Sequence, residues 1–136
     1  MNAKYNSNPV ALVVHGHHAV RRALCERIRA SFANFRLREA GSVEDALYML
    51  DDELIDIVLI DGDAPGVGGL KGTRAILDRS PSSSVIVMST ISEPTCLSAA
   101  SRAGAMAFVN KRAIGSELMH VLEEFTGRRA ARGVDD

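Results

Sequence analysis

Short apolar runs alternate with amphipathic stretches along this chain, and this alternation limits the possible folds more than any other feature. Three apolar runs predict strands buried on both faces, at 10–14, 55–60 and 85–88. Runs of this length between turn signals are typical of strands inside a parallel sheet. Weaker candidate strands lie at 35–39 and 106–109.

Each candidate strand is followed by a segment with apolar residues at helical spacing. The helices are expected at 18–31, 43–52, 68–79, 93–103 and 114–125. Ser42 suits the N-cap of the second helix, and Gly104 suits the residue just after the fourth. Five strands in alternation with five helices predict the α/β class, with a doubly wound parallel sheet.

The length of 136 residues indicates one domain, which we place at 9–126, between polar tails at 1–8 and 127–136. The second tail is expected to be frayed or to begin a linker. Lys and Arg number 16 against 17 Asp and Glu, so the charge gives no case for direct nucleic-acid binding. The sequence shows neither a signal peptide nor a membrane-length apolar run, and we expect a cytoplasmic protein without a membrane partner.

Polar residues follow several of the buried strands, at the edge where parallel α/β sheets place their sites. Asp61 ends one strand, Ser89 and Thr90 end another, and Lys111 follows the last. An Asp can act as a nucleophile that forms an aspartyl-phosphate. Such chemistry needs cations and hydrogen-bond donors around the phosphoryl oxygens, which Lys111 and Ser89 can supply.

Together these motifs resemble a response-regulator receiver domain of the CheY-like kind over about residues 9–126. The matching segments are Ile-Val-Leu-Ile-Asp61, Pro65-Gly66, Val-Ile-Val-Met-Ser89-Thr90 and Ala-Phe108-Val-Asn-Lys111. The resemblance implies a flavodoxin-like (βα)5 sheet with strand order 2-1-3-4-5. It implies a signalling role in a phosphorelay rather than an enzyme.

The same resemblance assigns roles to single residues. It makes Asp61 the phospho-acceptor, while Ser89, Thr90 and Lys111 contact the phosphoryl group. It makes Phe108 the aromatic side chain that follows the switch.

The sequence departs from the family at the end of its first strand. Receivers carry two adjacent acids there, which hold Mg²⁺, whereas this chain has His15 and Gly16. Mg²⁺ prefers oxygen ligands and is poorly served by imidazole. Asp61 and Asp63 alone make a doubtful metal site, so we expect weak or absent Mg²⁺ binding and a standing Asp61–Lys111 ion pair.

Three hypotheses for function follow from this departure. The first is a pseudo-receiver that acts through protein–protein interaction. The second is a receiver still phosphorylated on Asp61 by a histidine kinase, with a DNA-binding output domain outside this chain. The third is a transition-metal or pH-sensing protein that uses His15, His17 and His18.

The expected partners are a sensor histidine kinase or another signalling protein. The receiver resemblance places the signalling surface on the fourth helix, fifth strand and fifth helix, at 92–102, 106–111 and 114–125. A homodimer through this face is a further hypothesis. The sequence is closest to receivers of LuxR-type transcriptional regulators, which makes transcription regulation the candidate output.

Overall fold

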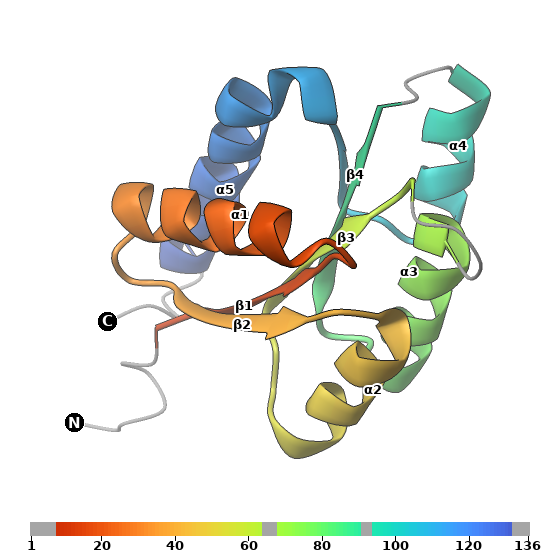
Figure 1. The fold of residues 1–136 in the computed structure, drawn as a ribbon, viewed down its shortest axis with the longest axis horizontal. Helices are drawn as coiled ribbons and strands as arrows, with labels where there is room; N and C mark the ends of the chain where they lie inside the picture. Colours follow the sequence, from red (N-terminus) through yellow and green to blue (C-terminus); the bar gives the residue numbers. More distant parts are fainter. Residues whose placement is uncertain (1–7, 64–67, 91–93, 132–136) are drawn as a thin grey trace.

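A five-stranded parallel sheet forms the centre of the molecule (Figure 1). The computed structural model describes residues 8–63, 68–90 and 94–131. The strand order is β2-β1-β3-β4-β5, which confirms the predicted fold and its topology. The strands are β1 (Val10–Val14), β2 (Arg36–Ala40), β3 (Ile57–Asp61), β4 (Ser84–Ser89) and β5 (Ala107–Asn110).

Helices cover both faces of this sheet (Figure 1). They are α1 (His18–Ser31), α2 (Val43–Asp52), α3 (Gly68–Arg79), α4 (Pro94–Arg102) and α5 (Ile114–Ala131), with a 3-10 turn, η2, at Lys111–Ala113. Side chains alternate along each strand, so β1 sends Ala11 and Val13 to the α1–α5 core and Leu12 to the α2–α3 core. The buried residues of the α2–α3 core are all aliphatic, whereas the α1–α5 core also contains Phe35 and Phe125, whose rings stack.

Two predicted elements differ from the structure for local reasons. The strand predicted at 55–60 lies at Ile57–Asp61, and the carboxylate of Asp56, just before it, accepts a hydrogen bond from the backbone N–H of Val10 at 2.7 Å. The last helix was expected to end at 125 and instead continues to Ala131. Alanine and arginine favour helix, and the helix continues through the first half of the expected tail, at 127–131.

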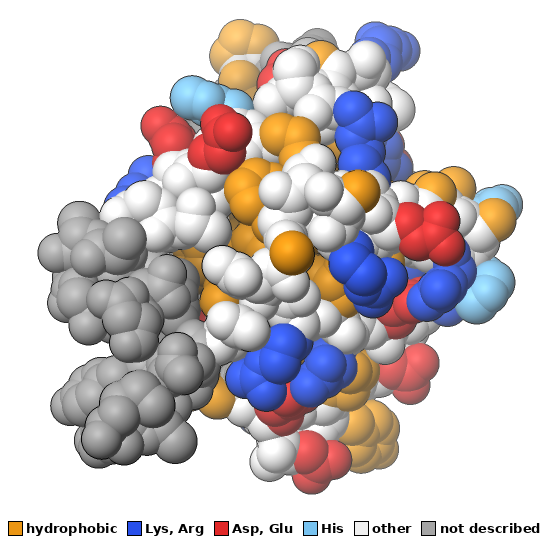
Figure 2. Space-filling view, turned by 90° about the vertical axis from the view of Figure 1, so that its left-hand side faces the viewer, with side chains coloured by type: hydrophobic (Ala, Val, Ile, Leu, Met, Phe, Trp, Pro, Cys, Tyr) orange, Lys and Arg blue, Asp and Glu red, His pale blue; other side chains and the backbone are white. Residues whose placement is uncertain are grey.

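Hydrophobic side chains are exposed on the side of the molecule that carries α1 and α5, with Lys and Arg side chains beside them (Figure 2). Among the described helices, none is both long and apolar enough to cross a membrane. The N-terminal segment 1–7 and the Pro65-Gly66 motif lie outside the described residues.

Candidate functional site at the carboxyl end of the sheet

Asp61 is the last residue of β3 and lies at the carboxyl edge of the sheet, with only 9% of its surface exposed. Lys111 follows β5, and its Nζ donates a hydrogen bond to Asp61 Oδ1 at 2.5 Å. The predicted Asp61–Lys111 ion pair is therefore present. It joins the ends of two strands that are 50 residues apart in the chain.

Asp63 folds back over the same edge and accepts hydrogen bonds from three residues. Ser89 Oγ donates to Asp63 Oδ1 at 2.5 Å. Thr90 donates to Oδ2 twice, from its backbone N–H at 2.9 Å and its hydroxyl at 3.0 Å. Lys111 Nζ lies 3.2 Å from the same oxygen. The sequence marked Asp63 only as a doubtful metal ligand, and the structure makes its carboxylate the centre of the site.

The charges of this cluster compensate one another. Burial tends to raise the pKa of Asp63, but the hydrogen bonds from Ser89, Thr90 and Lys111 outweigh it and lower the pKa to about 2. Burial tends to lower the pKa of Lys111, and the contacts with Asp61 and Asp63 outweigh this and raise it. At neutral pH the Asp63 carboxylate is therefore ionised, and the Lys111 ammonium group contacts both Asp63 and Asp61.

Two glycines bring the loop after β3 into this position. A Cβ on Gly62 would lie 2.7 Å from Val87 Cγ1, and a Cβ on Gly69 would lie 2.5 Å from the Gly62 Cα. The start of α3 therefore packs directly on the backbone between Asp61 and Asp63. The backbone N–H of Asp63 donates to Asp61 Oδ1 at 2.9 Å, which fixes the turn between the two carboxylates.

His15 lies on the opposite side of Asp61, just after β1. Its Nδ1 accepts a hydrogen bond from the backbone N–H of His17 at 3.0 Å, which requires this nitrogen to be unprotonated. Its Nε2 lies 3.6 Å from Asp61 Oδ2, too far for a hydrogen bond. Burial lowers the pKa of His15 and outweighs the opposing effect of Asp61. His15 is thus a neutral group that closes its own loop.

The other two histidines have separate local partners. His17 is the N-cap of α1, and its Nδ1 accepts from the backbone N–H of Val20 at 3.3 Å. His18 contacts Arg21 at 2.9 Å, and Arg21 also donates to the carbonyl oxygen of His15 at 2.7 Å. Sequence reasoning missed this role of Arg21, because no motif links it to the site.

The hypothesis of a transition-metal site is not supported by these contacts. Within the described ranges, no group of three or more His, Cys, Asp and Glu residues is placed to hold a metal ion. The donor set also fits Mg²⁺ poorly. Gly16 supplies no side-chain oxygen and His15 supplies nitrogen, while both oxygens of Asp63 are held by protein donors.

The remaining predicted switch residue is Phe108, in β5. It is half-buried and packs against the core on the α2–α3 side of the sheet. Its contacts are those of a core side chain, and its role in switching stays a prediction.

The fold and this site define a class of protein: a doubly wound α/β signalling domain with Asp, hydroxyl and Lys side chains at the carboxyl edge of its sheet. The sequence matches the response regulator receiver domain over residues 11–123. The chain belongs to this family. Receiver domains serve two-component signalling rather than acting as classical enzymes.

Individual relatives agree with this assignment. Transcriptional activator protein ExaE of Pseudomonas putida is 35% identical over 102 residues, which make up 75% of this chain and 48% of that protein. Response regulator GacA of Pseudomonas aeruginosa is 31% identical over 120 residues, covering 87% of this chain and 56% of that protein. The chain thus spans about half the length of these curated relatives.

Solved structures show the same architecture. A LuxR family DNA-binding response regulator from Silicibacter pomeroyi superposes with a TM-score of 0.74 at 29% identity. The match covers 85% of this chain and 88% of the solved chain. The expected likeness to LuxR-type receivers is confirmed.

Proposed function

We propose that this chain is an atypical receiver that signals by binding partner proteins, without Mg²⁺-dependent phosphorylation of Asp61. One observation carries the proposal: the carboxylate of Asp63 occupies the donors that a phosphoryl group on Asp61 would need. Ser89, Thr90 and Lys111 all donate to it. The Asp63 carboxylate therefore accepts the hydrogen bonds that a phosphoryl group would otherwise accept.

A phosphoryl group on Asp61 would compete with the Asp63 carboxylate, and electrostatic repulsion makes this exchange unfavourable. A phosphoryl group on Asp61 would carry up to two negative charges next to the charge of Asp63. Lys111 is the one cation in direct contact with the two carboxylates among the described residues, and it already balances both. Without acids at 15 and 16 to hold a divalent cation, no further positive charge is supplied. Phosphorylation would require Asp63 to leave its donors.

Phosphoryl transfer from acetyl phosphate tests the proposal. We expect intact-mass spectrometry to show no phosphoryl adduct on the wild-type chain, with or without Mg²⁺. The matched positive control is His15→Asp combined with Gly16→Asp, in which the family's acids are restored. A Cβ on Gly16 meets its nearest atom at 3.7 Å, so the side chain fits. An Mg²⁺-dependent adduct on wild-type Asp61 would overturn the proposal.

A second candidate is a phosphorylated receiver that controls DNA binding, and the relatives favour it. The relatives include a transcriptional activator and a DNA-binding response regulator. The curated relatives ExaE and GacA extend well beyond the matched region. In this version a sensor histidine kinase phosphorylates Asp61, and the output domain lies outside these 136 residues. Asp61→Asn separates the candidates, because it abolishes output only if Asp61 is phosphorylated.

Self-association through α4, β5 and α5 is part of the proposed signalling role. Leu97 of α4 is 39% exposed, although it is apolar, and it lies on this face. Leu97→Arg is expected to weaken a dimer in sedimentation experiments over a range of concentrations. Leu70→Arg is the control, because Leu70 is equally exposed but lies on α3. If Leu97→Arg and Leu70→Arg dimerise equally well, the proposed interface is wrong.

A further inference from the structure

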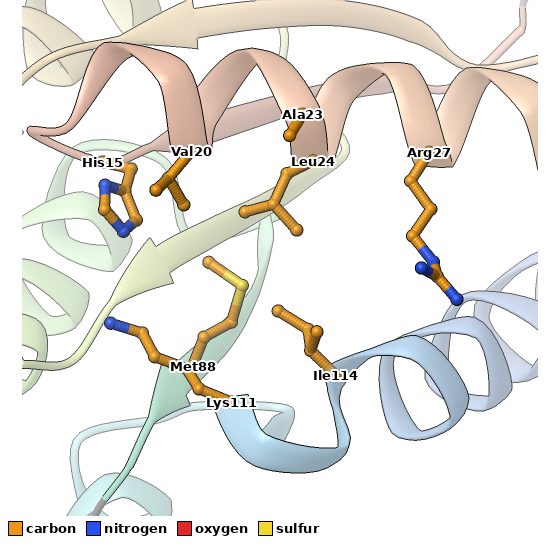
Figure 3. A pocket seen from close by; sticks show the side chains of 8 residues that line it. All are labelled: His15, Val20, Ala23, Leu24, Arg27, Met88, Lys111 and Ile114. Atoms are coloured by element: carbon orange, nitrogen blue, oxygen red, sulfur yellow. The ribbon is translucent and has the colours of Figure 1, made fainter.

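A cavity of about 550 Å³ opens between α1, β4 and the start of α5, next to the Asp61 site (Figure 3). Its volume falls within the range of about 300–1,000 Å³ that small-molecule sites occupy. Side chains from these elements, from the loop after β1 and from the 3-10 turn η2 point into it. They are His15, Val20, Ala23, Leu24, Arg27, Met88, Lys111 and Ile114.

The body of the cavity is apolar. Val20 and Leu24 descend from α1, Met88 forms the floor on β4, and Ile114 faces them from α5 (Figure 3). Val20 is 41% exposed in spite of its apolar side chain. An occupant with an apolar body would remove this surface from water and gain the corresponding hydrophobic free energy.

The charge of the lining is one-sided. Its cations are Arg27 and Lys111, its His15 is neutral, and it contains no Asp or Glu. Lys111 is already paired with Asp61 and Asp63. No carboxylate among the described residues forms an ion pair with Arg27. Its guanidinium is therefore the cation available to a ligand.

The position of Arg27 is set by Gly115, in the first turn of α5. A Cβ on residue 115 would lie 2.6 Å from Arg27 Nη2, so the guanidinium rests directly against the helix backbone. The N-terminal end of a helix carries positive potential, which adds to the charge of Arg27. One end of the apolar cavity is thus suited to an anion.

We propose that this cavity binds a small organic anion with an apolar body, held by Val20, Leu24, Met88 and Ile114, and an anionic group held by Arg27. The proposal goes beyond the signalling role above and does not depend on it. Because His15 and Lys111 line the same cavity and both face Asp61, an occupant of the cavity would contact the residues that surround Asp61.

Two fluorescent probes with the same ring system test the site on the full chain. The anionic probe is 1-anilinonaphthalene-8-sulfonate, and the neutral one is N-phenyl-1-naphthylamine. We expect saturable binding of the anionic probe with one site per chain. Unsaturable or absent binding of this probe overturns the proposal.

Variants on α1 locate the binding. Ala23→Trp places a large side chain in the cavity and is expected to weaken binding of both probes at least tenfold. Ala30→Trp is the control, because Ala30 is also exposed on α1 but does not line the cavity. Circular dichroism checks that both variants fold. If Ala23→Trp binds the probes as the wild type does, the site lies elsewhere and the proposal fails.

Charge variants test the anion end. Arg27→Gln is expected to weaken the sulfonate probe about tenfold, as loss of a charged hydrogen bond does, and to leave the neutral probe unchanged. Arg29→Gln is the matched control on the same helix, outside the cavity. Equal loss in both variants, or equal loss for both probes, contradicts the assigned role of Arg27. If the cavity is suited to an apolar segment of a partner protein instead, the neutral probe will bind at least as tightly as the anionic one. That result overturns the proposal of an anion site.

Discussion

The two sides of the Asp61 site have opposite characters. On the β3–β4–β5 side, Asp61, Asp63, Ser89 and Lys111 form a dense network of charged hydrogen bonds. On the β1 side, the family's acids are replaced by His15 and Gly16, and His15 is neutral. One side carries the residues that the receiver resemblance predicts to contact a phosphoryl group, while the other lacks the acids that it predicts to hold Mg²⁺.

The difference shows how protein groups alone can balance the carboxylates at the end of β3. In a metal-dependent site, clustered carboxylates repel one another until a cation binds. Here Asp63 lies just after the end of β3, and its charge is balanced by Lys111 and by hydroxyl donors from Ser89 and Thr90. The charges of the site are thus balanced by protein groups. Substitutions on the two sides test this balance and the missing acids separately.

The largest effect is expected from removing the cation of the charged side. Lys111→Met leaves Asp61 and Asp63 without their shared partner, with only 12% and 24% of their side chains exposed. We expect the free energy of unfolding to fall by about 2–3 kcal/mol, below the full cost of breaking a buried pair. Urea denaturation measures it. Lys71→Met, on the exposed surface of α3, should change stability by less than about 0.5 kcal/mol.

Restoring acids on the β1 side should add the Mg²⁺ ligands that this side lacks. The double variant His15→Asp, Gly16→Asp is expected to gain stability from Mg²⁺, by about 1.4 kcal/mol at tenfold excess over its dissociation constant. Thermal unfolding with and without Mg²⁺ measures the gain. The wild type should show no such stabilisation. A similar Mg²⁺ response in both proteins would mean that the β1 side is not what limits metal binding.

Acid titration should separate the two sides through Asp63. Its pKa of about 2 lies below the ordinary 3.8, so its contribution to stability is present above about pH 4 and is lost as the pH falls toward 2. Asp63→Asn should lower stability by about 1–2 kcal/mol at pH 7. The gap from wild type should then close in acid. Asp78→Asn, at an exposed position, is the control, and a gap that stays constant with pH contradicts the account.

The smallest effect is expected on the β1 side, at His15. Its folded pKa lies below 6.5, so its contribution is present above pH 6.5 and is lost as the pH falls through the lowered value. His15→Asn keeps an acceptor for the His17 N–H and does not titrate. Relative to wild type, this variant should gain about 0.5 kcal/mol between pH 7.5 and 5. His15→Ala removes the acceptor, and it should be less stable than His15→Asn at both pH values.

The sequence predicted the fold well because hydrophobic periodicity determines it. All five strands and five helices were expected close to their observed places, and the Ser42 N-cap accepts from Asp45 as predicted. The ion pair between Asp61 and Lys111 was also predictable, since both residues lie at the same edge of a parallel sheet. The elements follow from local pattern, whereas the strand order and the standing ion pair were expected from the resemblance to receivers.

The role of Asp63 could not be predicted in the same way. It depends on the angle of the loop after β3, which is set by contacts of Gly62 and Gly69 with residues distant in sequence. The histidines were equally ambiguous, because a run such as His15, His17 and His18 looks the same whether it binds metal or caps a helix. Only the three-dimensional hydrogen bonds distinguish these cases.

We proposed that Asp63 occupies the donors that a phosphoryl group on Asp61 would need. Titration with Mg²⁺ and beryllofluoride, a phosphoryl mimic, is the most direct test of this occupation. The amide signals of Asp63, Ser89 and Thr90 would be followed in ¹H–¹⁵N spectra of the wild type and of the variant with acids restored at 15 and 16. We expect no saturable shift in the wild type, because Asp63 already occupies the donors. Saturable, Mg²⁺-dependent shifts of the wild-type Ser89 and Thr90 signals would contradict it.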